Sequence, residues 1–410
     1  MSIISLFSGS FCREEPVSER LLQAMNYRLV TDREIVSAAS QLSGMATQKI
    51  ERAFSSKASI FNRFTHEKER AVAFLQQALA GILGDDALLI NGFCALLVPR
   101  TVSHVVSVCL IADLKWRSGI AARTENIAEK DATKLIHLRD EDSAAWANML
   151  HKVRDPWDAS LFDIVIPMDK TSEEEAAALV AQNMAKEVVR STERSMRMVE
   201  DFKLAAHVRV LLIGEGHYVD VSASAGNVTL TINKNVLMLS RLEEELKEIV
   251  SPLPGVSSVT TRVGEGFHRA DIYRRQDFEM PAKLLLVDDE REFVQTLSER
   301  LLLRNMGSAV TYDGESALSA VEIEEPDVMI LDLKMPGIDG IEVLQRVKKT
   351  NPDVEVIILT GHGSEDDRRT CLELGAFAYL QKPVDIDLLS EKLKQANEKI
   401  RRKKGQAPAG

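Results

Sequence analysis

The sequence predicts an α/β protein of several domains, with a doubly wound parallel sheet of five strands at its C-terminal end. Its 410 residues leave room for two to four domains. Short apolar runs alternate with helical segments along most of the chain, which is typical of parallel sheets covered by helices. One run, Val328–Leu331, is apolar at every position and ends in Asp332. This is the pattern of a buried central strand, and the chemistry of such sheets lies at the carboxyl ends of their strands.

Composition and charge exclude several classes of protein. The net charge of −11 argues against a general nucleic-acid binder. The cysteines are scattered without a CxxC pair, which predicts reduced thiols and neither a zinc site nor a disulfide frame; they are Cys12, Cys94, Cys109 and Cys371. The N-terminus lacks the features of a signal peptide, and no run of about 18 apolar residues is present. We therefore expect a soluble cytoplasmic protein that binds neither membranes nor nucleic acid.

The first residues have the form of a phosphate-binding loop without its functional signature. A strand is expected at Ile3–Phe7, then a small-residue loop, Ser8–Arg13, and a helix at Val17–Met25. The signature GxxxxGK[ST] needs a lysine for the phosphates and a hydroxyl for Mg²⁺. Only Gly9 remains, and no lysine follows it. The alternatives are nucleotide chemistry and a strand–loop–helix without such chemistry.

The rest of residues 1–185 also predicts a parallel α/β domain. Mostly helical sequence runs to about Leu83, and a second helical region covers residues 115–150. A capping sequence, Thr171–Glu175, starts a further helix. Three more strands are predicted in this region: Ala87–Ile90, Val105–Ile111 and Phe162–Ile166.

Together these stretches resemble the cytidylate-kinase-like branch of the P-loop nucleoside monophosphate kinases, over roughly residues 1–185. The residues that carry the resemblance are Tyr27 with Asp32-Arg33-Glu34-Ile35, Gly92, Arg117, Arg123, Asp155, Asp158 and Phe162–Ile166. The resemblance implies the fold of a kinase, but the phosphate loop is eroded, Asn91 replaces an expected arginine, and the lid-like region 137–146 keeps only Arg139. Because phosphoryl transfer depends on positioning and electrostatics, we expect kinase activity to be lost.

Some of these residues have a structural alternative. For Arg117 and Arg123 the alternatives are a nucleotide contact and a solvated helix face, while Asp155 and Asp158 are expected to form a turn.

Residues 186–263 form the second predicted region, a connector helix over 186–197 and a small α+β module. Its strands are expected at Tyr218–Ala223 and Val228–Ile232 around a Gly226-Asn227 turn, with a helix at Arg241–Val250. The order of elements resembles a BON-type module, which implies binding and not catalysis, although Thr231-Ile232-Asn233 stand where such modules have a glycine. Residues 264–281 are expected to be a linker.

The third region, residues 282–404, is followed by a tail at 405–410 and alternates strands and helices five times. The predicted strands are Lys283–Val287, Ala309–Tyr312, Val328–Leu331, Val354–Leu359 and Phe377–Leu380, and the last helix is Asp385–Arg402. Polar residues follow four of these strands: Asp288 and Asp289, Asp332, Thr360, and Lys382. All of them are therefore expected at one edge of the sheet.

This set of residues predicts a particular chemistry. Three carboxylates repel one another unless a divalent cation lies among them, and Mg²⁺ prefers such oxygen ligands. With Mg²⁺ bound, Asp332 can act as a nucleophile on phosphorus, and Lys382 and Thr360 can hold the phosphoryl oxygens. Each residue alone could have a turn or surface role.

The third region resembles the response-regulator receiver family over residues 282–400. The motifs are Val287–Glu290, Leu331–Gly337, Leu359–Gly361 and Tyr379–Pro383. The resemblance implies a flavodoxin-like (βα)5 fold with strand order 2-1-3-4-5. It implies that Asp332 accepts a phosphoryl group from a phosphohistidine. It also implies that Asp289, Asp332 and the Lys334 carbonyl bind Mg²⁺, that Asp288 acts through water, and that Thr360 and Tyr379 form the switch.

The sequence thus predicts a two-component response regulator that signals through N-terminal domains that do not bind DNA. The expected partners are a sensor histidine kinase or phosphotransfer protein, a downstream protein, and a second copy paired through the receiver. The output face is expected at the fourth strand, residues 364–374, the fifth strand and the last helix. The alternatives are a receiver-regulated nucleotide kinase and an interaction scaffold. The basic end of the last helix could bind an acidic partner or be a solvated helix end; its residues are Lys399, Arg401, Arg402, Lys403 and Lys404.

Overall fold

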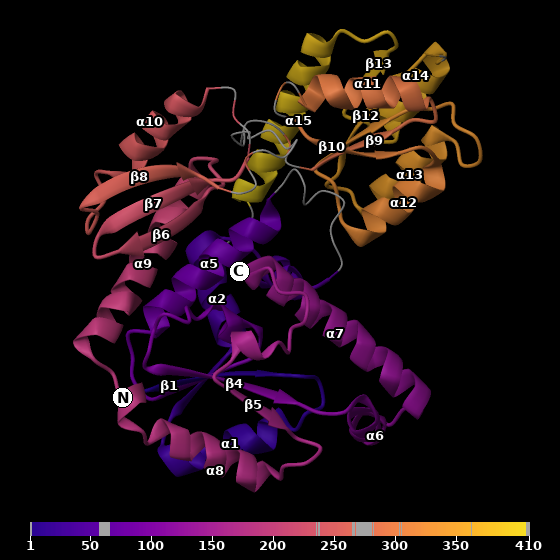
Figure 1. Cartoon of the computed structure of the whole chain (residues 1–410). Helices are drawn as coiled ribbons and strands as arrows, with labels where there is room; N and C mark the ends of the chain where they lie inside the picture. Colours follow the sequence, from indigo (N-terminus) through magenta and orange to yellow (C-terminus); the bar gives the residue numbers. More distant parts are fainter. Residues whose placement is uncertain are drawn as a thin grey trace. The chain divides into compact units, whose positions relative to one another are not determined.

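The computed structural model describes residues 2–406 apart from 57–65, 235, 237, 265, 266, 268–280, 282, 303, 305 and 362. These residues fall into two compact units, one containing residues 2–56 and 67–264 and the other residues 283–406 (Figure 1). Most of the predicted linker, 264–281, and the end of the predicted tail lie outside the described residues. None of the described helices is long and apolar enough to cross a membrane.

The first unit contains a parallel sheet of five strands in the order β2-β3-β1-β4-β5. The strands are β1 (Ile3–Ser8), β2 (Arg28–Thr31), β3 (Leu88–Asn91), β4 (Val105–Ile111) and β5 (Ile164–Pro167). The helices are α1 (Glu14–Met25), α2 (Asp32–Ser43), α3 (Thr47–Glu51), α5 (Glu67–Ile82), α6 (Leu114–Glu125), α7 (Glu129–His151) and α8 (Glu173–Met184). The 3₁₀ helices are η1 (Arg52–Phe54), η2 (Phe93–Leu97), η3 (Ala159–Leu161) and η4 (Glu187–Val189).

Helices cover both faces of this sheet because β1 is apolar on both sides. Ile4 and Leu6 point into the core formed with α1 and α8, whereas Ile3 and Phe7 point into the core formed with α2, α5 and α7. Figure 1 shows the resulting three layers. The predicted parallel α/β fold is confirmed, but the prediction missed the edge strand β2.

A smaller sheet completes the first unit. Its order is β6-β7-β8, in which β6 (Asp220–Ser224) and β7 (Asn227–Ile232) are antiparallel and β8 (Ser258–Val263) is parallel to β7. The helices α9 (Glu193–Gly214) and α10 (Leu239–Val250) supply its core. The hairpin turn consists of Ala225 and Gly226, and the predicted turn at Gly226-Asn227 is wrong. Ala225 and Gly226 both have positive φ, and Asn227 already pairs with Ser224 in the sheet.

The predicted connector helix over 186–197 is wrong. The α8 helix ends at Met184, and α9 begins only after Thr192. Thr192 and Ser195 form a capping box, which starts a new helix at this point. The α9 helix packs in the cores of both sheets of the first unit. Val199 lies in the core of the large sheet and Leu212 in the core of the small one.

The second unit is a parallel sheet of five strands in the order β10-β9-β11-β12-β13, which is the predicted 2-1-3-4-5 order. The strands are β9 (Leu284–Val287), β10 (Ser308–Thr311), β11 (Val328–Leu331), β12 (Glu355–Thr360) and β13 (Ala378–Gln381). The helices are α11 (Arg291–Leu302), α12 (Gly314–Ile323), α13 (Gly340–Thr350), α14 (Glu365–Glu373) and α15 (Ile386–Gln406). The cores place α11 and α15 on one face, and α12, α13 and α14 on the other.

Candidate functional site: an acidic cluster at the carboxyl edge of the second sheet

The ends of four strands bring the predicted site residues of the second unit to one edge. Strands β9 and β11 run in parallel with Val287 opposite Leu331, so the residues that follow, Asp288 and Asp332, are neighbours. In the same way, β12 and β13 pair Thr360 with Gln381, next to Lys382. The prediction that these residues share one edge of the sheet is confirmed.

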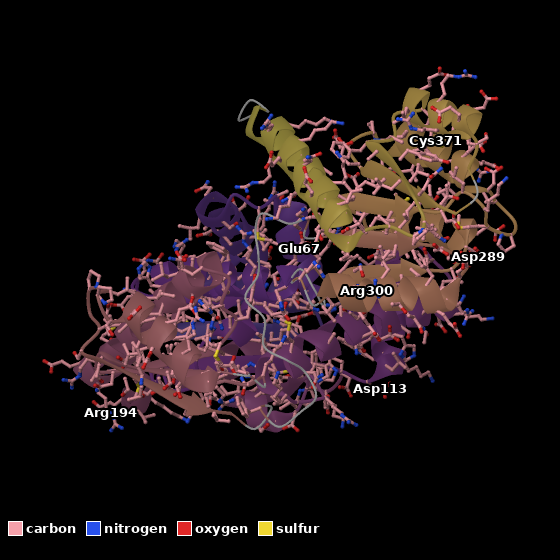
Figure 2. All side chains as sticks on the ribbon, turned by 90° about the horizontal axis from the view of Figure 1, so that it is seen from above. Glu67, Asp113, Arg194, Asp289, Arg300 and Cys371 are labelled. Atoms are coloured by element: carbon pink, nitrogen blue, oxygen red, sulfur yellow. The ribbon has the colours of Figure 1, made fainter. Side chains whose placement is uncertain are left out.

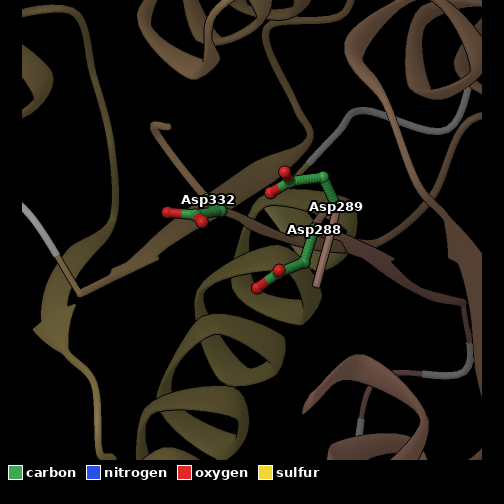
Figure 3. Close-up of side chains that lie close together, drawn as sticks. All are labelled: Asp288, Asp289 and Asp332. Carbon is green, nitrogen blue, oxygen red and sulfur yellow. The ribbon is translucent and has the colours of Figure 1, made fainter. Parts of the chain in front are cut away.

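The three carboxylates form a tight group. Oxygen atoms of Asp288, Asp289 and Asp332 all lie within 4.8 Å of one another (Figure 3). Asp288 and Asp332 are buried, whereas Asp289 is more exposed. Burial raises the pKa of Asp288, and hydrogen bonds from Lys382 and the Glu290 amide act in the opposite direction. The group therefore concentrates negative charge in a partly desolvated place.

Lys382 supplies the positive charge. Its Nζ atom lies 2.7 Å from Asp288 Oδ2, 3.2 Å from Asp332 Oδ2 and 2.9 Å from Glu290 Oε1. Burial acts to lower the pKa of Lys382, but its bonds to Asp288 and Glu290 outweigh burial and raise that pKa. The ammonium also lies 4.3 Å from the centre of the Phe293 ring.

Sequence reasoning assigned no role to Glu290 or Phe293. Glu290 directly follows Asp288 and Asp289 in the sequence, and this adjacency could have indicated that it lies near the site. The contact of Phe293 depends on the packing of α11 against the end of β13, which the sequence pattern does not encode.

The backbone around Asp332 orients its carboxylate. Oδ1 accepts a hydrogen bond of 2.7 Å from the Leu333 amide and a long one of 3.5 Å from the Lys334 amide. The start of α13 lies against the same segment. A side chain at Gly340 would collide with the carbonyl oxygen of Asp332. Only glycine allows the helix to approach this closely.

The two predicted switch residues, Thr360 and Tyr379, both lie near Gly363 in the loop after β12. Thr360 is fully buried at the end of β12. The Tyr379 ring packs against the core beneath α14, and its hydroxyl is buried without a hydrogen-bond partner among the described residues. A methyl group on Gly363 would contact both the Tyr379 hydroxyl and the Thr360 methyl group. Burial raises the pKa of Tyr379, so this hydroxyl stays protonated and able to donate.

The donor set fits a magnesium ion. Carboxylate oxygens are the ligands that Mg²⁺ prefers, and in this structure an ammonium group already balances two of the three acids. Bound Mg²⁺ would supply positive charge for a phosphoryl group and leave Lys382 able to bind its oxygens.

In the first unit, the structure shows what each of the two arginines contacts. Arg117 is buried, donates to the Ser10 carbonyl oxygen over 2.8 Å and binds both oxygens of Asp140. It is therefore not on a solvated helix face. Arg123 donates to the Gly119 carbonyl oxygen of its own helix.

The turn predicted for Asp155 and Asp158 is confirmed. Asp155 accepts a hydrogen bond from the Trp157 amide, and Asp158 accepts one from the Ser160 amide. Both bonds are short-range contacts that stabilise turns.

At the end of α15, basic residues pair with acids of the second unit, and Arg402 pairs with Glu398 of its own helix. Lys399 lies 2.8 Å from the buried carboxylate of Glu355, and Lys403 lies 3.2 Å from Asp353. These pairs hold α15 against the amino end of β12.

Two family models match the chain. The response regulator receiver domain matches residues 284–394, and the cytidylate kinase-like family matches residues 3–170. The second match agrees with the resemblance inferred from the sequence.

Curated relatives match the second unit. Sporulation initiation phosphotransferase F of Bacillus subtilis (strain 168) is 37% identical over 116 residues, which are 28% of this chain and 94% of that protein. The probable transcriptional regulator ycf27 of Guillardia theta is 41% identical over 118 residues, 29% of this chain and 46% of that protein. The chain spans about half or less of the length of this and several other regulators that it matches.

Among solved structures, a response regulator receiver domain protein from Clostridium thermocellum is 35% identical, with a TM-score of 0.28. The similarity covers 30% of this chain and 96% of that one.

Through its C-terminal receiver domain, this chain belongs to the response regulator family of two-component systems.

Proposed function

We propose that Asp332 accepts a phosphoryl group from the phosphohistidine of a sensor kinase or phosphotransfer protein in a reaction that depends on Mg²⁺. An oxygen of the Asp332 carboxylate forms a bond to phosphorus while the bond between phosphorus and the histidine nitrogen breaks. The observation that supports this most directly is the convergence of Lys382 on Asp288 and Asp332, at 2.7 and 3.2 Å.

The residues around Asp332 have separate proposed roles in binding Mg²⁺ and the phosphoryl group. Asp289, Asp332 and the Lys334 carbonyl are proposed Mg²⁺ ligands, with Asp288 acting through water. After transfer, the Lys382 ammonium and the Thr360 hydroxyl bind oxygens of the phosphoryl group. The Tyr379 hydroxyl has no hydrogen-bond partner among the described residues. A shift of Thr360 toward the phosphoryl group would change the surroundings of the Tyr379 ring, and the ring would then change its contacts.

The proposed output is a change in protein contacts. We place the output face on β12, α14, β13 and α15, where two receivers can also pair. The first unit matches the cytidylate kinase-like family over residues 3–170. We therefore propose that the signal passes to the first unit and from it to a downstream protein.

The second candidate is a receiver-regulated nucleotide kinase. It is favoured by the match to the cytidylate kinase-like family and by a cavity of about 650 Å³ beside the loop after β1. The residues of the loop oppose it, because the loop has no lysine and its Ser8 hydroxyl donates to Glu14. We propose that this unit has kept the fold of its family without phosphoryl transfer.

Phosphorylation of the full chain by acetyl phosphate tests the first proposal. With Mg²⁺, intact-protein mass spectrometry is expected to show one added phosphoryl group, which is lost with chelator and in the Asp332→Asn variant. The matched control is Asp339→Asn, which changes a carboxylate that caps α13 outside the cluster. A wild-type protein that gains no phosphoryl group, or an Asp332→Asn variant that is still modified, contradicts the proposal.

A further inference from the structure

The ammonium group of Lys382 contacts four side chains at the carboxyl edge of the receiver sheet. Its Nζ atom lies 4.3 Å from the centre of the Phe293 ring. It also lies within 3.2 Å of three carboxylates, those of Asp288, Glu290 and Asp332. An ammonium has three hydrogen-bond donors, so the three carboxylates can use all of them. Because the Lys382 side chain is only 10% exposed, its cation has a defined position and is not a solvated surface group.

Two of these contacts belong to the proposed magnesium site, and two do not. Asp288 and Asp332 are members of the three-acid cluster, so their oxygens would be shared with a divalent cation bound there. When Asp332 bonds to phosphorus, its negative charge passes to the phosphoryl oxygens. Glu290 and Phe293 are not part of the cluster; they lie just before α11 and in its first turn. These are the contacts that Lys382 can keep during phosphoryl transfer.

The two remaining contacts differ in their exposure and packing. The Glu290 side chain is 64% exposed, so water screens its attraction for the ammonium. The Phe293 ring packs against the core on the sheet face that α11 and α15 cover, and its neighbour Val294 is buried in that core. This packing fixes the ring, whose face attracts positive charge. The ring is therefore the contact that the fold itself holds beside Lys382.

We propose that Phe293 is a positioning residue for Lys382, whose ring keeps the ammonium within reach of the phosphoryl oxygens while Asp332 is modified. An oxygen of Asp332 forms a bond to phosphorus, and the bond from phosphorus to its donor breaks. Lys382 stays charged and exchanges its hydrogen bond to Asp332 for one to a phosphoryl oxygen. A cation that is already in place needs no reorganisation at this moment. The inference rests on the proposed function, because it assigns a residue to that reaction.

A measurement without Mg²⁺ and without a phosphoryl donor tests the contact itself. In the full chain labelled with ¹³C at lysine Cε, the ring current of Phe293 is expected to shift the Hε resonances of Lys382 upfield. Loss of these resonances in Lys382→Ala assigns them. Phe293→Leu should return them to the ordinary lysine position, and Phe293→Tyr should keep them shifted. Lys382 resonances at the ordinary position in wild type would contradict the inference.

The matched control is Phe377→Leu. Phe377 packs against the same core as Phe293, but its ring lies 5.4 Å from a different ammonium, that of Lys399. The substitution removes a ring of the same kind from the same core, and it is expected to leave the Lys382 resonances shifted. A return of these resonances to the ordinary position in Phe377→Leu would show that general packing, and not the Phe293 ring, causes the shift.

The rate of phosphorylation by acetyl phosphate at saturating Mg²⁺ tests the role of the contact. Phe293→Leu is expected to lower the rate constant about fivefold, the factor that corresponds to about 1 kcal/mol. Phe293→Tyr should stay within about twofold of wild type, because it keeps an aromatic face. Phe377→Leu should leave the rate unchanged. Because the ring acts through Lys382, Phe293→Leu should have no further effect in a Lys382→Ala background.

The results separate the inference from the proposed function. A wild-type protein that gains no phosphoryl group overturns the proposed function and, with it, the role of Phe293. If wild type is phosphorylated, two results overturn the inference alone: an unchanged rate in Phe293→Leu, or an equally large loss when Phe293→Leu is added to Lys382→Ala. Scanning calorimetry of each variant identifies any loss of rate that comes from unfolding.

Discussion

The guanidinium of Arg117 binds both oxygens of Asp140, with hydrogen bonds of 3.0 and 2.6 Å, while its Nε atom donates to the Ser10 carbonyl oxygen over 2.8 Å. One buried side chain therefore joins α6, α7 and the loop after β1. An arginine that could have bound phosphate instead fixes the wall of the cavity. The pair thereby ties the loop after β1 to both helices.

Asp140→Ala is expected to lower the unfolding free energy of the first unit by about 2 kcal/mol, because it leaves the buried guanidinium of Arg117 without its partner. Urea unfolding followed by tryptophan fluorescence measures this unit alone. Asp131→Ala, which breaks an exposed pair with Lys134, is the control and should cost less than about 0.5 kcal/mol. Equal effects of the two variants would show that the Arg117 pair is not stabilising.

Glu14 predicts a pH dependence of stability. Its pKa is raised to about 7 from an ordinary 4.5, so between these pH values the folded state holds a proton that the unfolded chain has released. Stability is therefore expected to fall as pH rises from 5 to 8, by on the order of 2 kcal/mol relative to Glu14→Gln, which cannot titrate. Urea unfolding of both proteins at several pH values gives the difference. A difference that does not change with pH contradicts the prediction.

Gly340 predicts a steric limit at the start of α13. In Gly340→Ala the new methyl group would collide with the Asp332 carbonyl oxygen, and we expect the receiver to lose about 3 kcal/mol of stability. Differential scanning calorimetry of the full chain measures this loss. At Gly361 an added methyl group would have its nearest neighbour, the Lys382 side chain, 3.9 Å away, so Gly361→Ala should cost less than about 1 kcal/mol.

Mg²⁺ is expected to stabilise the receiver, because a ligand that binds only the folded state adds about 1.4 kcal/mol at a tenfold excess over its Kd. Calorimetric scans with Mg²⁺ and with chelator measure the shift in Tm. Asp289→Asn removes one carboxylate of the cluster and should abolish most of the shift. The exposed control Glu315→Gln on α12 should keep it, and a full shift in Asp289→Asn would argue against Asp289 as a ligand.

The view of all side chains in Figure 2 places Asp289 on the second unit and Asp113 on the first. Both lie just beyond the carboxyl ends of parallel strands, but their surroundings differ. Asp289 belongs to a cluster of three acids, whereas Asp113 caps α6 by accepting from the Lys115 amide. An acid after a strand is therefore not enough to mark a site.

Much of the receiver could be predicted from its sequence. The strands β9 and β11 are apolar at every position, and the carboxyl ends of parallel strands must share an edge, so Asp288, Asp332 and Lys382 were expected to meet. Local patterns were less informative where solvent reaches the chain. Strand β2 was missed because an edge strand needs no apolar run, and Leu29 within it is exposed.

The sequence by itself determined the two parallel sheets, their family resemblances and the acidic edge of the receiver, because these follow from periodicity and from polar residues at strand ends. Only the tertiary structure decided the partners of Lys382 and Arg117 and the set of residues that line the cavity beside the loop after β1. The physical reason is distance along the chain. Glu290 and Lys382 are 92 residues apart and Arg117 and Asp140 are 23 apart, so only packing brings each pair together.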